Sequence, residues 1–169
     1  PSRDTTGPSG SVSINSGDIY ANSYYVTLSL SATDSQGVTG YYASTSSSTP
    51  SSYGWTSITS TTSYSGSVSY YLGSAEGTRT VYVWFRDGAG NVSTSYSDSI
   101  IRDGTSPTRY ITINNGSSYN RYTTSISVTI SSTDSVGVTG YYLSTSSTTP
   151  SASASACLSF VRCRLSLRS

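Results

Sequence analysis

Apolar and polar residues alternate one by one through several short segments of the chain. Between Tyr25 and Thr33, every second residue is apolar: Val26, Leu28, Leu30 and Ala32. A second run between Thr78 and Arg86 places three apolar residues on one parity: Val81, Val83 and Phe85. Successive side chains of a strand point to opposite faces of a sheet, so both runs predict strands with one dry face.

Turn-forming residues separate these two runs from further short segments rich in Val, Ile, Thr and Tyr, which suit strands. The additional predicted strands are Ser11–Ile14, Val38–Ala43, Trp55–Ile58, Val68–Leu72 and Tyr96–Ile101. No segment shows a helical period. About seven short strands predict an all-β fold, an immunoglobulin-like Greek-key β-sandwich, with a closed barrel as the alternative.

The chain also repeats itself. The segment PSGSVSINSGDIY from Pro8 has a counterpart, PTRYITINNGSSY, from Pro107, which is 99 positions later. A longer block from Ser31 returns almost unchanged from Ser131, now 100 positions later. A period of about 100 residues is the size of one immunoglobulin-type sandwich. The repeat also indicates how the third strand faces: Leu143 stands where the first copy has Ala43, which favours the Tyr41/Ala43 face as core.

The repeat predicts three regions. Residues 4–102 form a complete sandwich, and residues 103–151 hold only the first three strands of a second one. That second copy lacks the strands that would cover its apolar face, so we expect it to be poorly ordered or to pack against the first copy. The pattern stops after Ser151, and we interpret residues 152–169 as a frameshifted or disordered tail. This tail contains Cys157 and Cys163, which either form a disulfide in an oxidising compartment or are accidental.

Three short motifs resemble those of bacterial immunoglobulin-like tandem repeats. DTTGP from Asp4 resembles the D-T-T-x-P opening of such a repeat, and TDSQGV from Thr33 resembles its T-D-x-x-G-V turn. DGAGNVS from Asp87 resembles the D-x-A-G-N-x-S turn between the last two strands. Fibronectin type III-like modules have a similar layout and remain an alternative. The resemblance implies an extracellular or cell-surface protein, an adhesin or secreted enzyme, in which the partners are neighbouring repeats of the same chain.

Composition argues against several functions. The chain has no His, which removes Ser–His and Cys–His triads and the usual zinc ligands, and Glu76 is its single Glu. Charged residues make up 10% of the chain and the net charge is +1, which opposes nucleic acid as a partner. No apolar run is long enough to insert into a membrane. We therefore expect a protein without catalytic activity.

Calcium is the one cofactor that the residues suggest. In the predicted topology, the loops that follow the second and sixth strands meet the entering linker at one end, which gathers Asp4, Asp34, Asp87 and Asn91. A second candidate set would lie between the repeats: Glu76, Asp103 and Asp134. Calcium prefers such clusters of oxygen ligands. The alternative is that each Asp caps its own turn through backbone amides.

Two functions fit these observations. The first is a structural spacer or stalk repeat of a cell-surface or secreted protein. The second is an accessory carbohydrate-binding module, with surface glycans or a host protein as ligand. It would need a flat patch of three or more exposed rings, since the chain has more aromatic residues than one core can hold. These residues are Tyr24, Tyr25, Tyr64, Tyr70, Tyr71, Tyr82, Trp84 and Tyr96.

Overall fold

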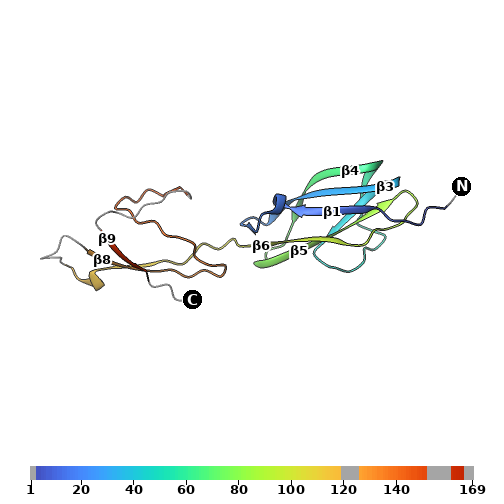
Figure 1. Cartoon of the computed structure of the whole chain (residues 1–169). Coiled ribbons are helices and arrows are strands. Elements are labelled where there is room, and N and C mark those ends of the chain that lie inside the picture. Colours follow the sequence, from blue (N-terminus) through green and yellow to red (C-terminus); the bar gives the residue numbers. More distant parts are fainter. Residues whose placement is uncertain (1–2, 119–125, 152–160, 166–169) are drawn as a thin grey trace. The chain divides into compact units, whose positions relative to one another are not determined.

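A computed structural model of the chain describes residues 3–118, 126–151 and 161–165. The chain divides into two compact units, residues 1–104 and 105–169, and each is described by itself (Figure 1). The regular structure of the described residues consists of β-strands and two short 3-10 turns. No helix among these residues has the length and apolar character needed to cross a membrane.

Unit 1 is built from six strands. They are β1 (Ser9–Ile14), β2 (Tyr20–Ala21), β3 (Tyr25–Ser44), β4 (Thr56–Tyr71), β5 (Gly77–Asp87) and β6 (Tyr96–Arg102). The hydrogen-bonded order is β1-β3-β5-β6-β2, and β4 pairs with β3 as well. Neighbours are antiparallel except β2, which runs parallel to β6. The turn η1 (Asn15–Gly17) follows β1.

Two strands are longer than the sequence predicted. The predicted strands 25–33 and 38–43 form the single strand β3, and the predicted strands 55–58 and 68–72 fall largely within β4. The first half of β3 lies between β1 and β4, and its second half lies between β4 and β5. Register shifts between Thr33 and Gly40 divide the halves. Bulges of this kind bend a strand, so a separate loop is not needed to turn the chain from one layer to the other.

The same irregularity explains the facing of the second half of β3. Val38 and Tyr41 have opposite parity, yet Val38 is fully buried and Tyr41 packs against the core. A register shift between Val38 and Gly40 reverses the alternation, so both residues can face inward. The predicted Tyr41/Ala43 core face is therefore confirmed, and Val38 joins it.

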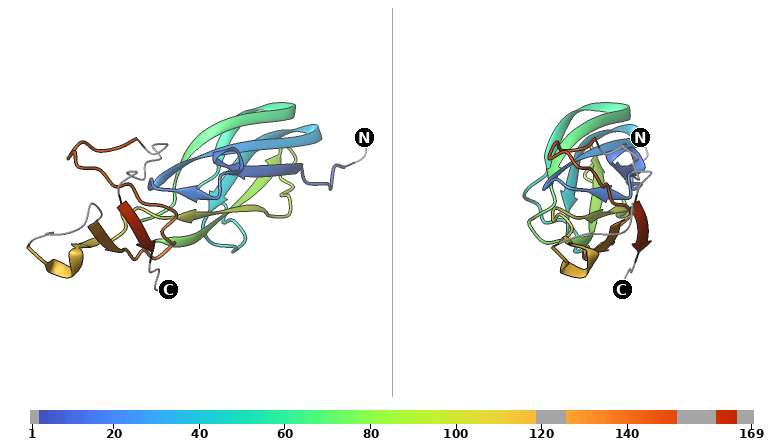
Figure 2. Two further views of the ribbon diagram at one scale, coloured as in Figure 1. Left: turned by 60° about the vertical axis from the view of Figure 1, so that its left-hand side comes forward. Right: turned by 90° about the vertical axis from the view of Figure 1, so that its left-hand side faces the viewer.

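The sheet curls so that its edge strand β1 approaches β6. The amide of Ile14 on β1 donates a 2.7 Å hydrogen bond to the Asp98 carboxylate on β6. In Figure 1, β1, β3 and β4 lie above β5 and β6, and Figure 2 shows the curvature of the longer strands. The predicted dry faces are confirmed, with Leu28, Val81, Val83 and Phe85 at 0% exposure and Leu30 at 2%. Unit 1 is thus an all-β structure of the β-sandwich class.

Unit 2 begins as a copy of unit 1. Strand β7 (Tyr110–Ile113), the turn η2 (Asn114–Gly116) and strand β8 (Ile126–Ser131) repeat β1, η1 and the start of β3. Ile113 pairs with Val128, as Ile14 pairs with Leu28. The Asn114 side chain accepts the amide of residue 127 at 2.9 Å, as Asn15 accepts that of residue 27 at 2.8 Å.

The rest of unit 2 differs from the prediction. The third strand expected after Gly137 is not formed within the described residues 132–151. The tail instead contains strand β9 (Val161–Leu165), which pairs in parallel with β8. The tail is therefore not wholly irregular. Cys157 lies outside the described residues, so the proposed disulfide with Cys163 stays a prediction.

Candidate metal site

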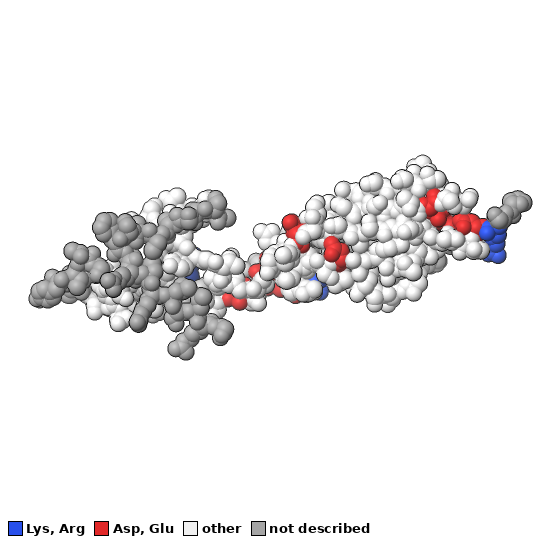
Figure 3. Space-filling model, viewed as in Figure 1, with Lys and Arg blue, Asp and Glu red and all other residues white. Residues whose placement is uncertain are grey.

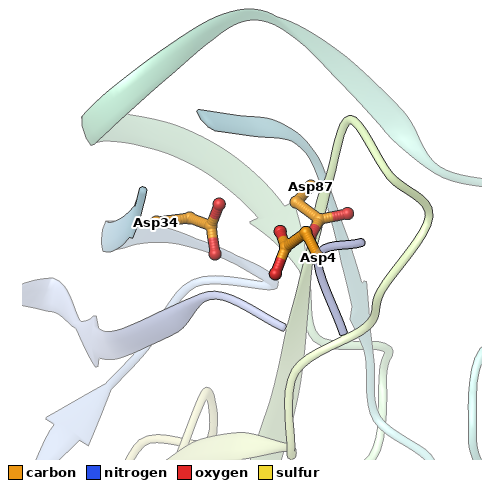
Figure 4. Close-up of side chains that lie close together, drawn as sticks. All are labelled: Asp4, Asp34 and Asp87. Atoms are coloured by element: carbon orange, nitrogen blue, oxygen red, sulfur yellow. The ribbon is translucent and has the colours of Figure 1, made fainter. Parts of the chain in front are cut away.

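Three carboxylates meet at one end of unit 1. Asp4 belongs to the segment that leads into β1, Asp34 lies at the bulge of β3, and Asp87 is the last residue of β5. One carboxylate oxygen from each lies within 4.8 Å of the others (Figure 4). Three of the four residues predicted for a site in unit 1 are thus brought together from three distant parts of the sequence.

Asn91 lies beside Asp87 and Asp4, as predicted, and its nitrogen atoms donate hydrogen bonds to both. Its side-chain amide nitrogen donates to the Asp87 carboxylate at 2.7 Å and to the Asp4 backbone carbonyl at 3.3 Å. Its backbone amide donates to the same Asp87 carboxylate at 2.8 Å. Asn91 is therefore a positioning residue, which ties the entering segment to the end of β5.

Asp87 is held ionised although it is buried. Its exposure is 2%, and Thr39 also donates a 2.8 Å hydrogen bond to its backbone carbonyl. Burial raises the pKa of the Asp87 carboxyl, but hydrogen bonds from Asn91, the interaction with the Asp4 side chain and the Ala89 amide outweigh this, and the pKa lies below its ordinary value. The cluster therefore contains a fixed negative charge at neutral pH.

The other two carboxylates leave oxygen atoms available. Asp34 accepts the amides of Gln36 at 2.8 Å and Gly37 at 3.1 Å through one oxygen, as the turn-capping alternative predicts. The same turn recurs at Asp134 in unit 2. Asp4 accepts the amide of Thr6 through one oxygen, whereas its other oxygen is buried and has no hydrogen-bond partner. A buried carboxylate oxygen without a donor is costly unless a cation completes it.

No such cation is supplied by the described side chains. Among them, the ion pair within 4 Å joins Arg102 to Glu76, elsewhere in unit 1. Acidic atoms gather at the end of unit 1 where the chain enters, beside basic atoms of the N-terminal segment (Figure 3). Oxygens bound to one calcium ion at about 2.4 Å lie at most about 4.8 Å apart, so three oxygens within 4.8 Å of one another are close enough to share an ion. The arrangement can hold a divalent cation between the entering segment and two turns.

The second predicted set, expected between the repeats, is divided over the two units and stays a prediction. Glu76 lies 3.5 Å from Arg102 and accepts the amide of Gly104 at 3.1 Å. Asp103 continues the exit from β6, where its amide donates to the Ala21 carbonyl at 2.8 Å. Asp134 belongs to unit 2 and caps its own turn. Among the described acidic residues, the group close enough to share an ion is Asp4, Asp34 and Asp87.

The aromatic residues form pairs and small clusters. Trp84 has the opposite parity to the core residues Val83 and Phe85 on β5, yet it is only 4% exposed and packs against Tyr42 and Tyr82. The exposed rings of Tyr25 and Tyr71 lie 5.2 Å apart with an angle of 49° between their planes. Tilted pairs of this kind stabilise neighbouring strands and do not make a flat platform.

Sequence reasoning missed two features of unit 1. Arg86 stacks over the Trp55 ring at 5.0 Å, and the nearly buried Arg102 stacks over Tyr24 at 4.2 Å. The parity of Arg102 on the last strand gave a weak signal, because it follows the inward-facing Ile100 by two positions.

These features define a class: an all-β protein of the β-sandwich type with a carboxylate cluster at the end where its chain enters. Comparison with known proteins goes no further, because no protein-family model matches the chain and no curated protein or solved structure matches it significantly.

Proposed function

We propose that the chain is a non-catalytic structural spacer, built from immunoglobulin-like Greek-key repeats of an extracellular bacterial surface or secreted protein, and that its carboxylate cluster binds calcium. The observation that carries the proposal is the convergence of Asp4, Asp34 and Asp87 at the chain's entry into unit 1. The three sequence motifs and the repeat of about 100 residues support the same assignment.

The path of the chain through unit 1 suits a spacer. The chain enters beside the cluster, where Asn91 binds the Asp4 carbonyl. It leaves unit 1 after the last residue of β6, at the end of the sheet away from the cluster. There the amide of Asp103 donates to the Ala21 carbonyl. Entry and exit at opposite ends let repeats follow one another along one direction, so each copy extends the reach of the chain.

Calcium would act on the entering segment. Asp4 belongs to no strand, and its described links to the body of unit 1 include the hydrogen bond from Asn91. An ion shared with Asp34 and Asp87 would attach this segment to two turns of the sandwich. The cluster would then restrict motion of the linker, which is what a spacer under load requires.

Thermal unfolding with and without calcium tests the proposal. Both tryptophans, Trp55 and Trp84, lie in unit 1, so their fluorescence follows this unit in the full chain. At a calcium concentration about 100 times Kd, binding to the folded state adds about 2.7 kcal/mol to the free energy of unfolding. That should raise the Tm by about 10 °C. An unchanged Tm at millimolar calcium would refute the site.

Two variants make the test specific. Asp34→Asn removes a ligand charge and should abolish most of the calcium-dependent rise in Tm. Asp18→Asn removes an exposed charge outside the cluster and should leave the rise intact. Equal responses of the two variants would mean that calcium acts through general charge screening.

The pH dependence follows from Asp87. Its pKa is lower in the folded state than in the unfolded chain, so its contribution to stability is complete above the unfolded value of about 4. The contribution is lost as the pH falls through the lower folded value. Without calcium, the Tm of unit 1 should therefore decrease on acidification below about pH 4.

A further inference from the structure

The chain leaves unit 1 through a short segment that is bound to the body of the sandwich. Strand β6 ends at Arg102. Beyond it, the amide of Asp103 donates a 2.8 Å hydrogen bond to the Ala21 carbonyl on β2. The next amide, that of Gly104, donates a 3.1 Å hydrogen bond to the Glu76 carboxylate. Two successive main-chain donors after the last strand therefore have partners in unit 1.

A buried cation lies beneath this exit segment. Arg102 is 3% exposed, and its Nη1 atom lies 3.0 Å from the Ser74 carbonyl oxygen and 3.5 Å from the Glu76 carboxylate. Its guanidinium carbon lies 4.2 Å from the centroid of the Tyr24 ring. Among the described residues, its Nε atom has no hydrogen-bond partner. A buried charge is costly unless it is paired, so the cation depends on the carboxylate and on the ring face.

One carboxylate oxygen joins the cation to the exit segment. Oε1 of Glu76 faces Nη1 of Arg102 and also accepts the Gly104 amide. Because a buried cation holds this oxygen, it is a fixed acceptor, unlike the carboxylate of a freely rotating surface side chain. Gly104 also lies close to the cation, since a Cβ atom on it would come within 2.7 Å of Nη2 of Arg102. A glycine is therefore what lets the main chain approach the guanidinium.

We propose that Arg102, Glu76 and Tyr24 form a latch, which holds residues 103 and 104 as a rigid extension of unit 1 and fixes the direction in which the chain leaves the sandwich. The latch connects three segments: the end of β6, the connection between β4 and β5, and the connection between β2 and β3. It consists of side chains alone and needs no ion. The inference goes beyond the spacer proposal and does not depend on the calcium site.

Backbone ¹⁵N relaxation of the isotope-labelled full chain, measured without calcium, tests the latch. In the wild-type chain, the amides of residues 103 and 104 should have order parameters of about 0.85, the value of rigid backbone. Glu76→Ala removes the acceptor of the Gly104 amide, so the order parameter of that amide should fall below about 0.6. Exchange of the same amide with solvent should become about tenfold faster.

Matched variants make the test specific. Asp18→Ala removes an exposed acidic side chain elsewhere in unit 1 and should leave residues 103 and 104 rigid. Tyr24→Phe keeps the ring beside the guanidinium and should preserve the order, whereas Tyr24→Leu removes the ring and should lower it. Arg102 itself stays in place in every variant, and tryptophan fluorescence verifies that unit 1 remains folded.

Three results would each overturn the inference. The first is an order parameter below about 0.6 for residues 103 and 104 of the wild-type chain. The second is unchanged order in Glu76→Ala, and the third is the same effect of Tyr24→Phe and Tyr24→Leu. Asp34→Asn, which tests the calcium site, should leave residues 103 and 104 rigid, so failure of the latch and failure of the calcium site are distinguishable.

Discussion

Replacement of Leu28 by Ala measures whether the curled sheet of unit 1 encloses a true core. Leu28 is 0% exposed on β3 and lies between Ile14 on β1 and Val68 on β4. Shortening a fully buried Leu removes its transfer free energy and leaves a cavity, which together cost about 3 kcal/mol. For a domain of about 100 residues, this loss lowers the Tm by about 12 °C or more.

Urea unfolding followed by tryptophan fluorescence gives the corresponding free energy, because both tryptophans belong to unit 1. Thr27→Ala is the matched control: Thr27 is the preceding residue of the same strand and its side chain is exposed, so it should cost less than about 1 kcal/mol. Equal effects of the two substitutions, or a cost below about 1 kcal/mol for Leu28→Ala, would mean that β3 does not bury one face. The sandwich, and the spacer proposal with it, would then be refuted.

Four further substitutions, two of them combined in a double-mutant cycle, test other parts of unit 1. Asn91→Ala removes the side-chain hydrogen bond to the buried Asp87 carboxylate and the one to the Asp4 backbone carbonyl. It should lower the free energy of unfolding by about 2 kcal/mol at pH 7, a loss that shrinks at acid pH in urea titrations. Gly10→Ala would place a Cβ 2.5 Å from the Phe85 ring and should cost about 1–3 kcal/mol, read from the same titration; a neutral effect would contradict the close packing of β1. A double-mutant cycle of Tyr25→Ala and Tyr71→Ala should give a coupling free energy of about 0.5–1 kcal/mol between the two rings. In a separate pull-down, the wild-type chain should stay in solution when mixed with insoluble glycans. Retention on glycans that is lost in both variants would instead favour the carbohydrate-binding module.

The two halves of the chain show how the same local sequence reaches different ends. Asn15 and Asn114 form the same turn, with positive φ values of 47° and 46°, and each binds the start of the next strand. Beyond this hairpin the units diverge: within the described residues, strands like β4, β5 and β6 occur in unit 1 alone. The local hydrogen bonds of the turn therefore recur in both copies, whereas the exposed fractions of equivalent side chains, such as Ile14 and Ile113, differ.

The sequence by itself determined the strands with one dry face, the positions of the tight turns and the repeat. These depend on the alternation of Leu28 and Leu30 with polar neighbours and on local side-chain hydrogen bonds, which act over a few residues. It also indicated that Asp4, Asp34 and Asp87 belong together, through motifs at the expected ends of strands.

The tertiary structure decided what those short-range rules leave open. Only the assembled sheet shows that a bulge merges two predicted strands into β3, and that Asn91 turns its amide nitrogen toward Asp87. It also shows that β9 takes the edge of β8 in the parallel direction. Each of these outcomes is set by contacts between segments far apart in the sequence, and alternation within one segment carries no information about which distant partner meets it.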